Sequence, residues 1–148
     1  MKKIALFALV MAVAVAGLTF AQAKPDFSGK WAPKEAAAPA AGARGGMGGP
    51  MTVKQTATDL TQEVVRGENT MTTVYKLDGT ESVNKTQRGE SKSTAKFDGA
   101  KLVIKTVMET ANGSMETTAT WSLSADGKEL TITRTTQRGE NSTVYVKQ

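Results

Sequence analysis

The sequence contains neither histidine nor cysteine. A chain without them has no Ser-His or Cys-His nucleophile pair, no disulfide and almost none of the imidazole and thiolate groups that hold metal ions. Carboxylates remain, but no motif pairs any two of Glu63, Glu81, Glu109 and Glu116, as glycoside hydrolysis would require. We therefore expect a protein that is not an enzyme, with no catalytic residue, no metal site and no cofactor.

Charge and large apolar side chains are also scarce. The formal net charge is +5 over 148 residues, and aromatic residues make up 5% of the chain. So weak a positive balance does not indicate a nucleic-acid partner. Few large side chains are available to fill a core, which allows a cavity of mixed lining inside the fold.

The first 23 residues have the three parts of a secretory signal peptide. Lys2 and Lys3 form the basic start, residues 4–18 are apolar, and Ala21-Gln22-Ala23 is a small-x-small cleavage site. The alternative is an uncleaved membrane anchor, but the apolar run is shorter than the roughly 20 residues that a spanning helix needs. We expect a signal peptide at residues 1–23 and a single domain at residues 24–148 that does not span the membrane. A short basic signal before a cysteine-free domain favours a periplasmic or secreted bacterial protein.

Residues 33–50 form a low-complexity stretch of alanine, glycine and proline. This composition has little to bury and much backbone entropy to lose, which predicts a flexible loop. A helix over residues 35–41 is the alternative, and Pro39 interrupts it.

After this stretch, glycine-led turns recur at the spacing of consecutive β-strands. They fall at Arg66-Gly67, Asp78-Gly79, Arg88-Gly89, Asp98-Gly99, Asn112-Gly113, Asp126-Gly127 and Arg138-Gly139. Asp-Gly and Asn-Gly tolerate positive φ and are strong hairpin signals between half-apolar runs. The intervening segments are rich in threonine and valine and alternate in polarity. They predict strands at about 27–32, 51–57, 60–66, 69–77, 80–87, 91–97, 100–111, 114–124, 128–137 and 141–147.

Each predicted strand has one apolar face. Tyr75 and Leu77 share one face, for example, while Val74 and Lys76 share the other. No amphipathic helix is available to cover the apolar face, so a sheet of this size most simply closes on itself. The sequence thus predicts an all-β, antiparallel, up-and-down barrel of about eight to ten strands. A two-sheet sandwich needs the same alternation and is the alternative, whereas the charged outer positions disfavour an outer-membrane barrel.

Several short segments together carry a family resemblance. Phe27-Ser28-Gly29-Lys30-Trp31 places Gly-x-Trp on the first strand, and the pattern continues at residues 96–104, 121–128, 130–134 and 144–145. The chain resembles the lipocalins and the wider calycin group, most closely small exported bacterial lipocalin-like proteins. The resemblance implies a ligand-binding barrel but names no ligand. Ten strands exceed the usual eight of a lipocalin, which leaves the strand count of a fatty-acid-binding protein open.

The barrel interior is the first candidate site. Period-2 counting turns inward a set of large side chains and one cation, namely Trp31, Tyr75, Phe97, Trp121 and Arg134. They could line a cavity for a small apolar or amphipathic ligand; alternatively, they fill the barrel. The resemblance implies two possible roles for Arg134. It could bind the carboxylate of a ligand, as internal arginines do in related fatty-acid carriers, or it could lie over the Trp31 indole and close the barrel.

A repeated Arg-Gly-Glu is the second candidate site. Arg88-Gly89-Glu90 recurs as Arg138-Gly139-Glu140, with an echo at Arg66-Gly67-Glu68. Every second turn of an up-and-down meander lies at the same end, so Arg66, Arg88 and Arg138 should share one rim. That rim would bind a partner, or the motif is ordinary hairpin chemistry with cross-strand charge pairs worth ~0.2–1 kcal/mol.

These features favour an exported, monomeric, non-enzymatic protein that binds a small, largely apolar ligand inside a β-barrel. An envelope interaction or inhibitor protein that acts through the Arg-Gly-Glu rim is the alternative interpretation.

The signal peptide provides a direct test of export. Expressed in a bacterium, the exported chain should begin at Lys24, because signal peptidase cleaves after the small residues Ala21 and Ala23. Intact-mass spectrometry of the periplasmic fraction measures this, with Ala23→Arg as a variant that should stay uncleaved. A periplasmic chain that keeps residues 1–23 would contradict the prediction.

Overall fold

The computed structural model describes residues 23–34, 49–86 and 89–148. The predicted signal peptide up to residue 22, residues 35–48 of the predicted loop, and Arg88 lie outside the described residues. Within the described ranges there is no helix that is long and apolar enough to cross a membrane.

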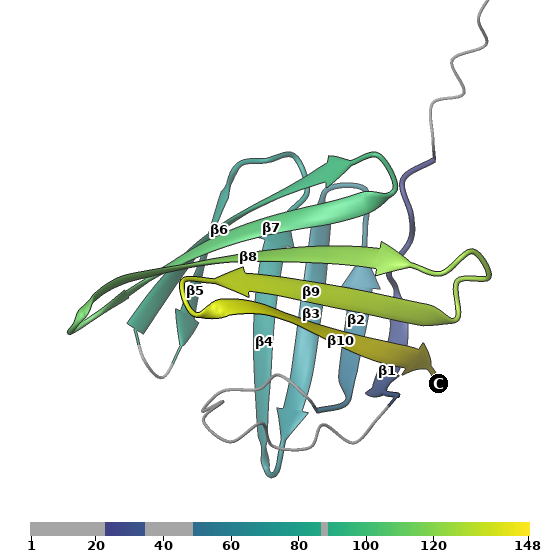
Figure 1. Cartoon of the computed structure of the whole chain (residues 1–148), viewed down its shortest axis with the longest axis horizontal. Helices are drawn as coiled ribbons and strands as arrows, with labels where there is room; N and C mark the ends of the chain where they lie inside the picture. The colour runs from purple at the N-terminus through teal and green to yellow at the C-terminus, as the bar shows by residue number, and fades with distance from the viewer. Residues whose placement is uncertain (1–22, 35–48, 87–88) are drawn as a thin grey trace, which may run out of the picture.

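Ten β-strands make up most of the described chain (Figure 1). They are β1 (Gly29–Pro33), β2 (Met51–Gln55), β3 (Asp59–Arg66), β4 (Asn69–Lys76), β5 (Glu81–Thr86), β6 (Gly89–Asp98), β7 (Lys101–Thr110), β8 (Gly113–Leu123), β9 (Glu129–Thr136) and β10 (Gly139–Lys147). Every strand lies within about two residues of a predicted strand at each end, so the strand prediction is confirmed.

The glycines of the predicted turns explain why the strands end where they do. All seven have positive φ, from 58° at Gly67 to 129° at Gly89, and no other residue type does so among the described residues. An L side chain rarely adopts this region, so glycine permits each reversal at little cost.

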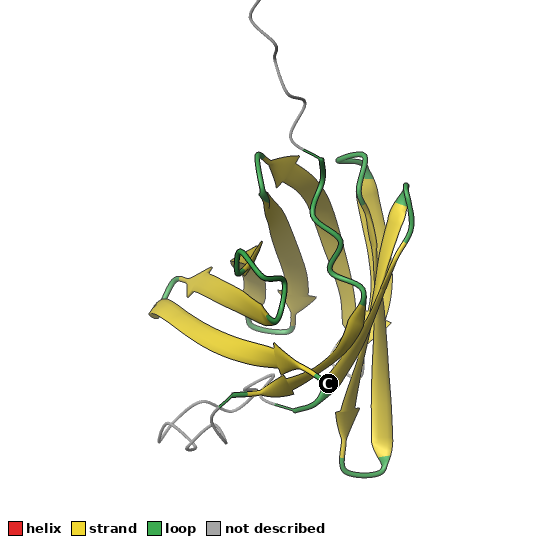
Figure 2. Ribbon diagram, turned by 90° about the vertical axis from the view of Figure 1, so that its right-hand side faces the viewer, coloured by secondary structure: helices red, strands yellow, loops and turns green. Residues whose placement is uncertain are grey.

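The ten strands form one antiparallel sheet in the order β4-β3-β2-β1-β10-β9-β8-β7-β6-β5. β1 pairs with β2 on one side and with β10 on the other. The sheet curls until its two outer strands, β4 and β5, lie next to each other (Figures 1 and 2). The structure therefore confirms an up-and-down barrel of ten strands, and one continuous sheet excludes the two-sheet sandwich.

The barrel closes between β4 and β5 through side chains. These two strands are not ladder neighbours, although the Asp78-Gly79 turn predicts a hairpin. Asn84 Nδ2 donates to the Val74 carbonyl and Asn84 Oδ1 accepts from the Val74 N–H, both at 2.9 Å, while Ser82 Oγ accepts from the Lys76 N–H at 2.8 Å. The hairpin prediction was wrong here because these side chains take the backbone groups of β4 that a partner strand would otherwise bond. We call this junction the seam.

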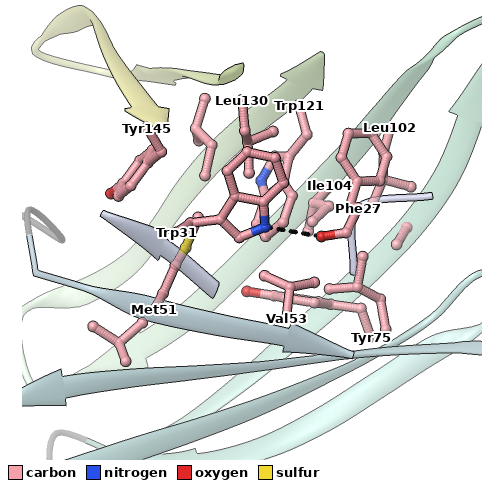
Figure 3. Packing of buried hydrophobic residues seen from close by; sticks show 14 of the residues in the cluster. Phe27, Trp31, Met51, Val53, Tyr75, Leu102, Ile104, Trp121, Leu130 and Tyr145 are labelled. Carbon is pink, nitrogen blue, oxygen red and sulfur yellow. Dashed lines mark hydrogen bonds between the residues drawn. The ribbon is translucent and has the colours of Figure 1, made fainter. Parts of the chain in front are cut away.

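Alternate residues of each strand face the interior. Leu60 pairs with Tyr75, and Leu102 pairs with Trp121, and all four are buried. The buried apolar residues form one cluster (Figure 3), which comprises Phe27, Trp31, Met51, Val53, Leu60, Val64, Tyr75, Leu77, Ala95, Leu102, Ile104, Trp121, Leu130, Ile132 and Tyr145. The predicted period-2 assignment of inner and outer faces is therefore confirmed.

The segment before β1 plugs one end of the barrel. Residues 23–28 run between the walls of the barrel (Figure 2), and the Phe27 ring meets the Trp121 ring edge-on with centroids 5.8 Å apart. Trp31 Nε1 donates to the Phe27 carbonyl at 3.0 Å (Figure 3). We call this the plugged end.

Gln55, the last residue of β2, holds the plugging segment in place. Its Oε1 accepts from the Phe27 N–H at 3.0 Å, and its Nε2 donates to the Pro25 carbonyl at 2.9 Å. One side chain thus satisfies two backbone groups of a segment that has no ladder of its own.

The seam predicts a specific effect of Asn84→Ala. Loss of both bonds to Val74 should lower the free energy of unfolding by about 1–2 kcal/mol and speed amide exchange at Val74. Urea unfolding and hydrogen exchange measure the two effects, with Lys85→Ala, an exposed neighbour, as the control. Unchanged exchange at Val74 would show that Asn84 does not close the barrel.

Candidate functional site

The interior of the barrel changes character along its axis. Next to the plugged end, the inward positions of β6 to β9 hold the large residues Phe97, Leu102, Trp121 and Leu130. At the opposite end lie the turns at Gly67, Gly113 and Gly139, which we call the rim end. Toward the rim end, the inward residues of these strands are first small and polar, and then include Met108 and Met115.

One row of hydroxyl residues crosses five neighbouring strands. Successive cross-strand partners on β5 to β9 are Ser82, Ser93, Thr106, Thr117 and Thr136. Directly opposed residues share a face of the sheet, so all five lie on the inner face. Ser93 Oγ and Thr106 Oγ1 hydrogen-bond to each other at 2.9 Å. We call this set the hydroxyl row.

The two halves also differ in how tightly their side chains are buried. Trp31 and Trp121 at the plugged end are each 1% exposed, and Phe27 is fully buried. Inward residues nearer the rim end, among them Thr106 and Thr117, are only half-buried. Because these side chains face inward, their accessible surface lies on the inner side of the sheet.

The predicted interior residues divide between these two environments. Trp31 and Trp121 fill the plugged end, and Phe97 is half-buried there with Lys24 Nζ 5.2 Å from its ring centroid. Tyr75 is buried, and Arg134 is half-buried on β9 one row from the hydroxyl row. The structure thus separates the indoles from the one inward-facing arginine of the predicted set.

Lys147, not Arg134, lies over the Trp31 indole. Lys147 Nζ is 5.5 Å from the ring centroid, and Lys147 is the cross-strand partner of Trp31. Arg134 instead pairs with Ala119 and Asn141, two strands away from β1. The role implied for Arg134 by the lipocalin resemblance therefore belongs to a different cation.

The glycine of Gly-x-Trp is favoured by its backbone conformation. Gly29 has a φ of 144°, which residues with a side chain rarely adopt. A Cβ there would also lie 2.8 Å from Cε of Lys147, and the flexible lysine side chain would have to move.

Arg134 lies in an electrostatic cluster with two tyrosines. Burial lowers the pKa of the Arg134 guanidinium; Tyr75 and Tyr145 oppose this shift, and like charge on Arg66 adds to it. Burial likewise raises the pKa of Tyr75 and of Tyr145, which Arg134 partly offsets. Two protonated phenols and a guanidinium from β4, β10 and β9 are thus brought together inside the barrel.

Sequence reasoning missed Tyr145 as a member of this cluster. Tyr145 is 2% exposed and pairs with Leu130 on the inner face. Alternation along β10 could have predicted from the sequence that Tyr145 faces inward. Only the closed sheet, however, brings β10 next to β1 and places β4 on the opposite wall of the barrel.

The topology places the predicted rim arginines as follows. Arg66 ends β3 and Arg138 precedes β10, so both lie at the rim end, and both are exposed. Arg88 lies outside the described residues. Ion pairs form away from this motif, between Lys34 and Glu129 and between Lys54 and Glu63.

No group of three or more metal-ligating side chains is present among the described residues. Every fully buried side-chain nitrogen or oxygen in the same part of the chain has a hydrogen-bond partner.

Solved structures show the same fold. The fluorescent protein UnaG, as its N57A mutant, superposes with a TM-score of 0.62 and 20% identity, over 82% of this chain and 96% of that chain. The REP1-NXSQ fatty acid transporter superposes with a TM-score of 0.61 and 14% identity, over 82% of this chain and 96% of that chain. Lipid binding protein 8 of Caenorhabditis elegans superposes with a TM-score of 0.56 and 12% identity, over 67% of this chain and 70% of that chain.

These likenesses show that the chain has the antiparallel, lipocalin-like β-barrel fold of these proteins. At these identities they establish the fold alone. No protein-family model matches the chain, and no curated protein matches its sequence.

The tyrosine environment predicts a late titration. Tyr75 and Tyr145 are the only tyrosines, and burial raises both pKa values above the ordinary value of about 10. As pH rises through 10, the unfolded chain loses phenolic protons that the folded chain keeps, so this contribution to stability falls. Phenolate absorbance should therefore appear at higher pH in the native protein than in urea. Coincident titrations would contradict the buried cluster.

Proposed function

We propose that this chain is an exported, monomeric, non-enzymatic binding protein that holds a small, largely apolar or amphipathic acid inside the barrel. The observation that carries the proposal is the placement of Arg134 on the inner face beside Tyr75 and Tyr145. The half-buried inward side chains toward the rim end supply accessible surface next to it.

An acidic group suits this cluster electrostatically. The pKa of Arg134 is lowered because burial disfavours its charge, and a carboxylate beside it restores a charge-assisted interaction. The raised pKa values of both tyrosines keep the phenols protonated at neutral pH, so each can donate a hydrogen bond to an anion. A guanidinium with two phenols therefore favours one carboxylate per barrel.

The fold and the signal peptide support the rest of the proposal. Two structurally similar proteins are described as a fatty acid transporter and a lipid binding protein. Small-ligand sites in proteins are mostly concave and occur preferentially in places such as the mouths of β-barrels. Residues 1–23 carry the features of a signal peptide, which supports export to the bacterial envelope or out of the cell.

The rim supports a second candidate function. Arg66 and Arg138 are exposed at the same end of the barrel. An envelope interaction or inhibitor protein would use this surface, and its binding would depend on these arginines and not on Arg134.

Native mass spectrometry of protein purified from a bacterial periplasm tests the proposal first. A mass excess that disappears on denaturation would identify a bound small molecule. The purified, delipidated protein is then titrated with dodecanoate by calorimetry. Arg134→Gln should weaken binding about tenfold to a hundredfold, because a charged hydrogen bond is lost.

The controls separate the two candidate functions. Arg138→Gln changes an exposed arginine of the rim and should leave dodecanoate affinity unchanged. Tyr145→Phe removes one hydroxyl with little change of shape and keeps the test valid if Arg134→Gln folds poorly. Dodecanoate binding that depends on Arg138 and not on Arg134 would contradict an interior site.

A further inference from the structure

We infer that the ligand is a short acid whose body carries hydroxyl or amide groups, not a long alkyl chain. The inference rests on the interior acid site of the proposed function and departs from its largely apolar ligand, because it names a ligand body that carries polar groups. It follows from where the accessible interior surface lies relative to Arg134.

The apolar end of the barrel is already occupied by the protein itself. Phe27, Trp31, Trp121 and Leu130 are at most 1% exposed, and the Phe27 and Trp121 rings pack against each other. An alkyl chain gains free energy by covering apolar surface that water would otherwise touch. The plugged end offers almost none, so a long tail has no apolar slot below Arg134.

From Arg134 toward the rim end, the accessible wall mixes threonine side chains with methionines. Ala119 on β8 is the cross-strand partner of Arg134. Thr117 lies on the same face of β8, two residues closer to the rim end. In the described part of the chain the Thr117 hydroxyl makes no hydrogen bond, and Ser93 and Thr106 bond only to each other there. A hydroxyl carries one donor and two acceptor sites, so the half-buried Thr106 and Thr117 keep capacity for a ligand, whereas Ser93 is 1% exposed.

Polar groups also face this space from the other side of Arg134 and from the opposite wall. Asn141 on β10 is the other cross-strand partner of Arg134, and the half-buried Thr73 lies on the inner face of β4. Its partner Gln62 is 2% exposed and donates to Met51 Sδ, so Thr73 is the accessible group of that pair. Covering such groups with an alkyl chain would strand them without partners, whereas hydroxyl or amide groups of a ligand would pair with them.

Three methionines add apolar surface to this lining. Met71 and Met108 face inward and are half-buried, and Met115, the cross-strand partner of Met108, is 51% exposed. Flexible thioether side chains adapt to the C–H faces of a polyhydroxylated chain. The wall therefore fits a molecule that alternates hydroxyl and C–H groups beyond its carboxylate.

Gluconate and hexanoate form a matched pair of probes. Both are monocarboxylates with the same number of carbons, and they differ in the hydroxyl groups of the body. Binding to the delipidated protein is measured by NMR titration at neutral pH, following the backbone and methyl signals of Thr117 and Ala119. Gluconate should bind at least about tenfold more tightly than hexanoate, and shifts should centre on these residues.

Thr117→Val removes the hydroxyl and keeps the shape of the side chain. It should weaken gluconate about fivefold, the loss of about one neutral hydrogen bond, and leave hexanoate unchanged. Thr118→Val is the control, because Thr118 is the next residue on β8 and lies on the outer face opposite Lys105. Equal losses in both variants would overturn the assignment of the hydroxyl row.

The outcomes distinguish this inference from the proposed function. Tighter binding of hexanoate, or equal binding of the two acids, overturns the inference, and Arg134-dependent binding of dodecanoate then leaves the proposed function standing. If no acid binds, both fail. Gluconate binding that is lost in Arg134→Gln and weakened in Thr117→Val supports both.

Discussion

The double pairing of β1 is the interaction on which the rest of the structure depends. This five-residue strand bonds to β2 on one side and to β10 on the other, and so joins β2–β4 to β5–β10 in one sheet. It also carries Trp31 into the core and brings Lys147 over the indole. The chain has no cysteine, so closure relies on such ladders and on the side-chain bonds of Asn84 and Ser82 at the seam.

Closure at β1 also explains why the interior is polarised. The segment before β1 must enter at one end, where Gln55 holds it and Phe27 fills the space beside Trp121. The aromatic side chains Phe27, Trp31 and Trp121 thereby fill the plugged end. The opposite half holds serine, threonine and methionine side chains, and Arg134 lies between the two environments. The plugged end thus contributes most of the buried aromatic surface that stabilises the fold, and the other half keeps accessible side chains that could contact a ligand.

Much of the architecture is predictable because its causes are local. Positive φ at Gly67 and Gly127 follows from the turn chemistry of residues adjacent in sequence. The burial of Tyr75 and the exposure of Val74 follow from the alternation of a pleated strand. The candidate site is less predictable: the inward direction of Arg134 can be counted along β9, but its tyrosine neighbours come from β4 and β10.

The sequence by itself determined the strands, their turns, the inner and outer faces and the excess of small polar residues, because each depends on a few neighbouring residues. Only the tertiary structure decided that Lys147 and not Arg134 covers Trp31, that β4 and β5 meet through Asn84, and that one hydroxyl row spans five strands. These features depend on register between strands far apart in the chain. Register is set by closure of the whole sheet, since a shift of one residue would turn every inward side chain to the outside.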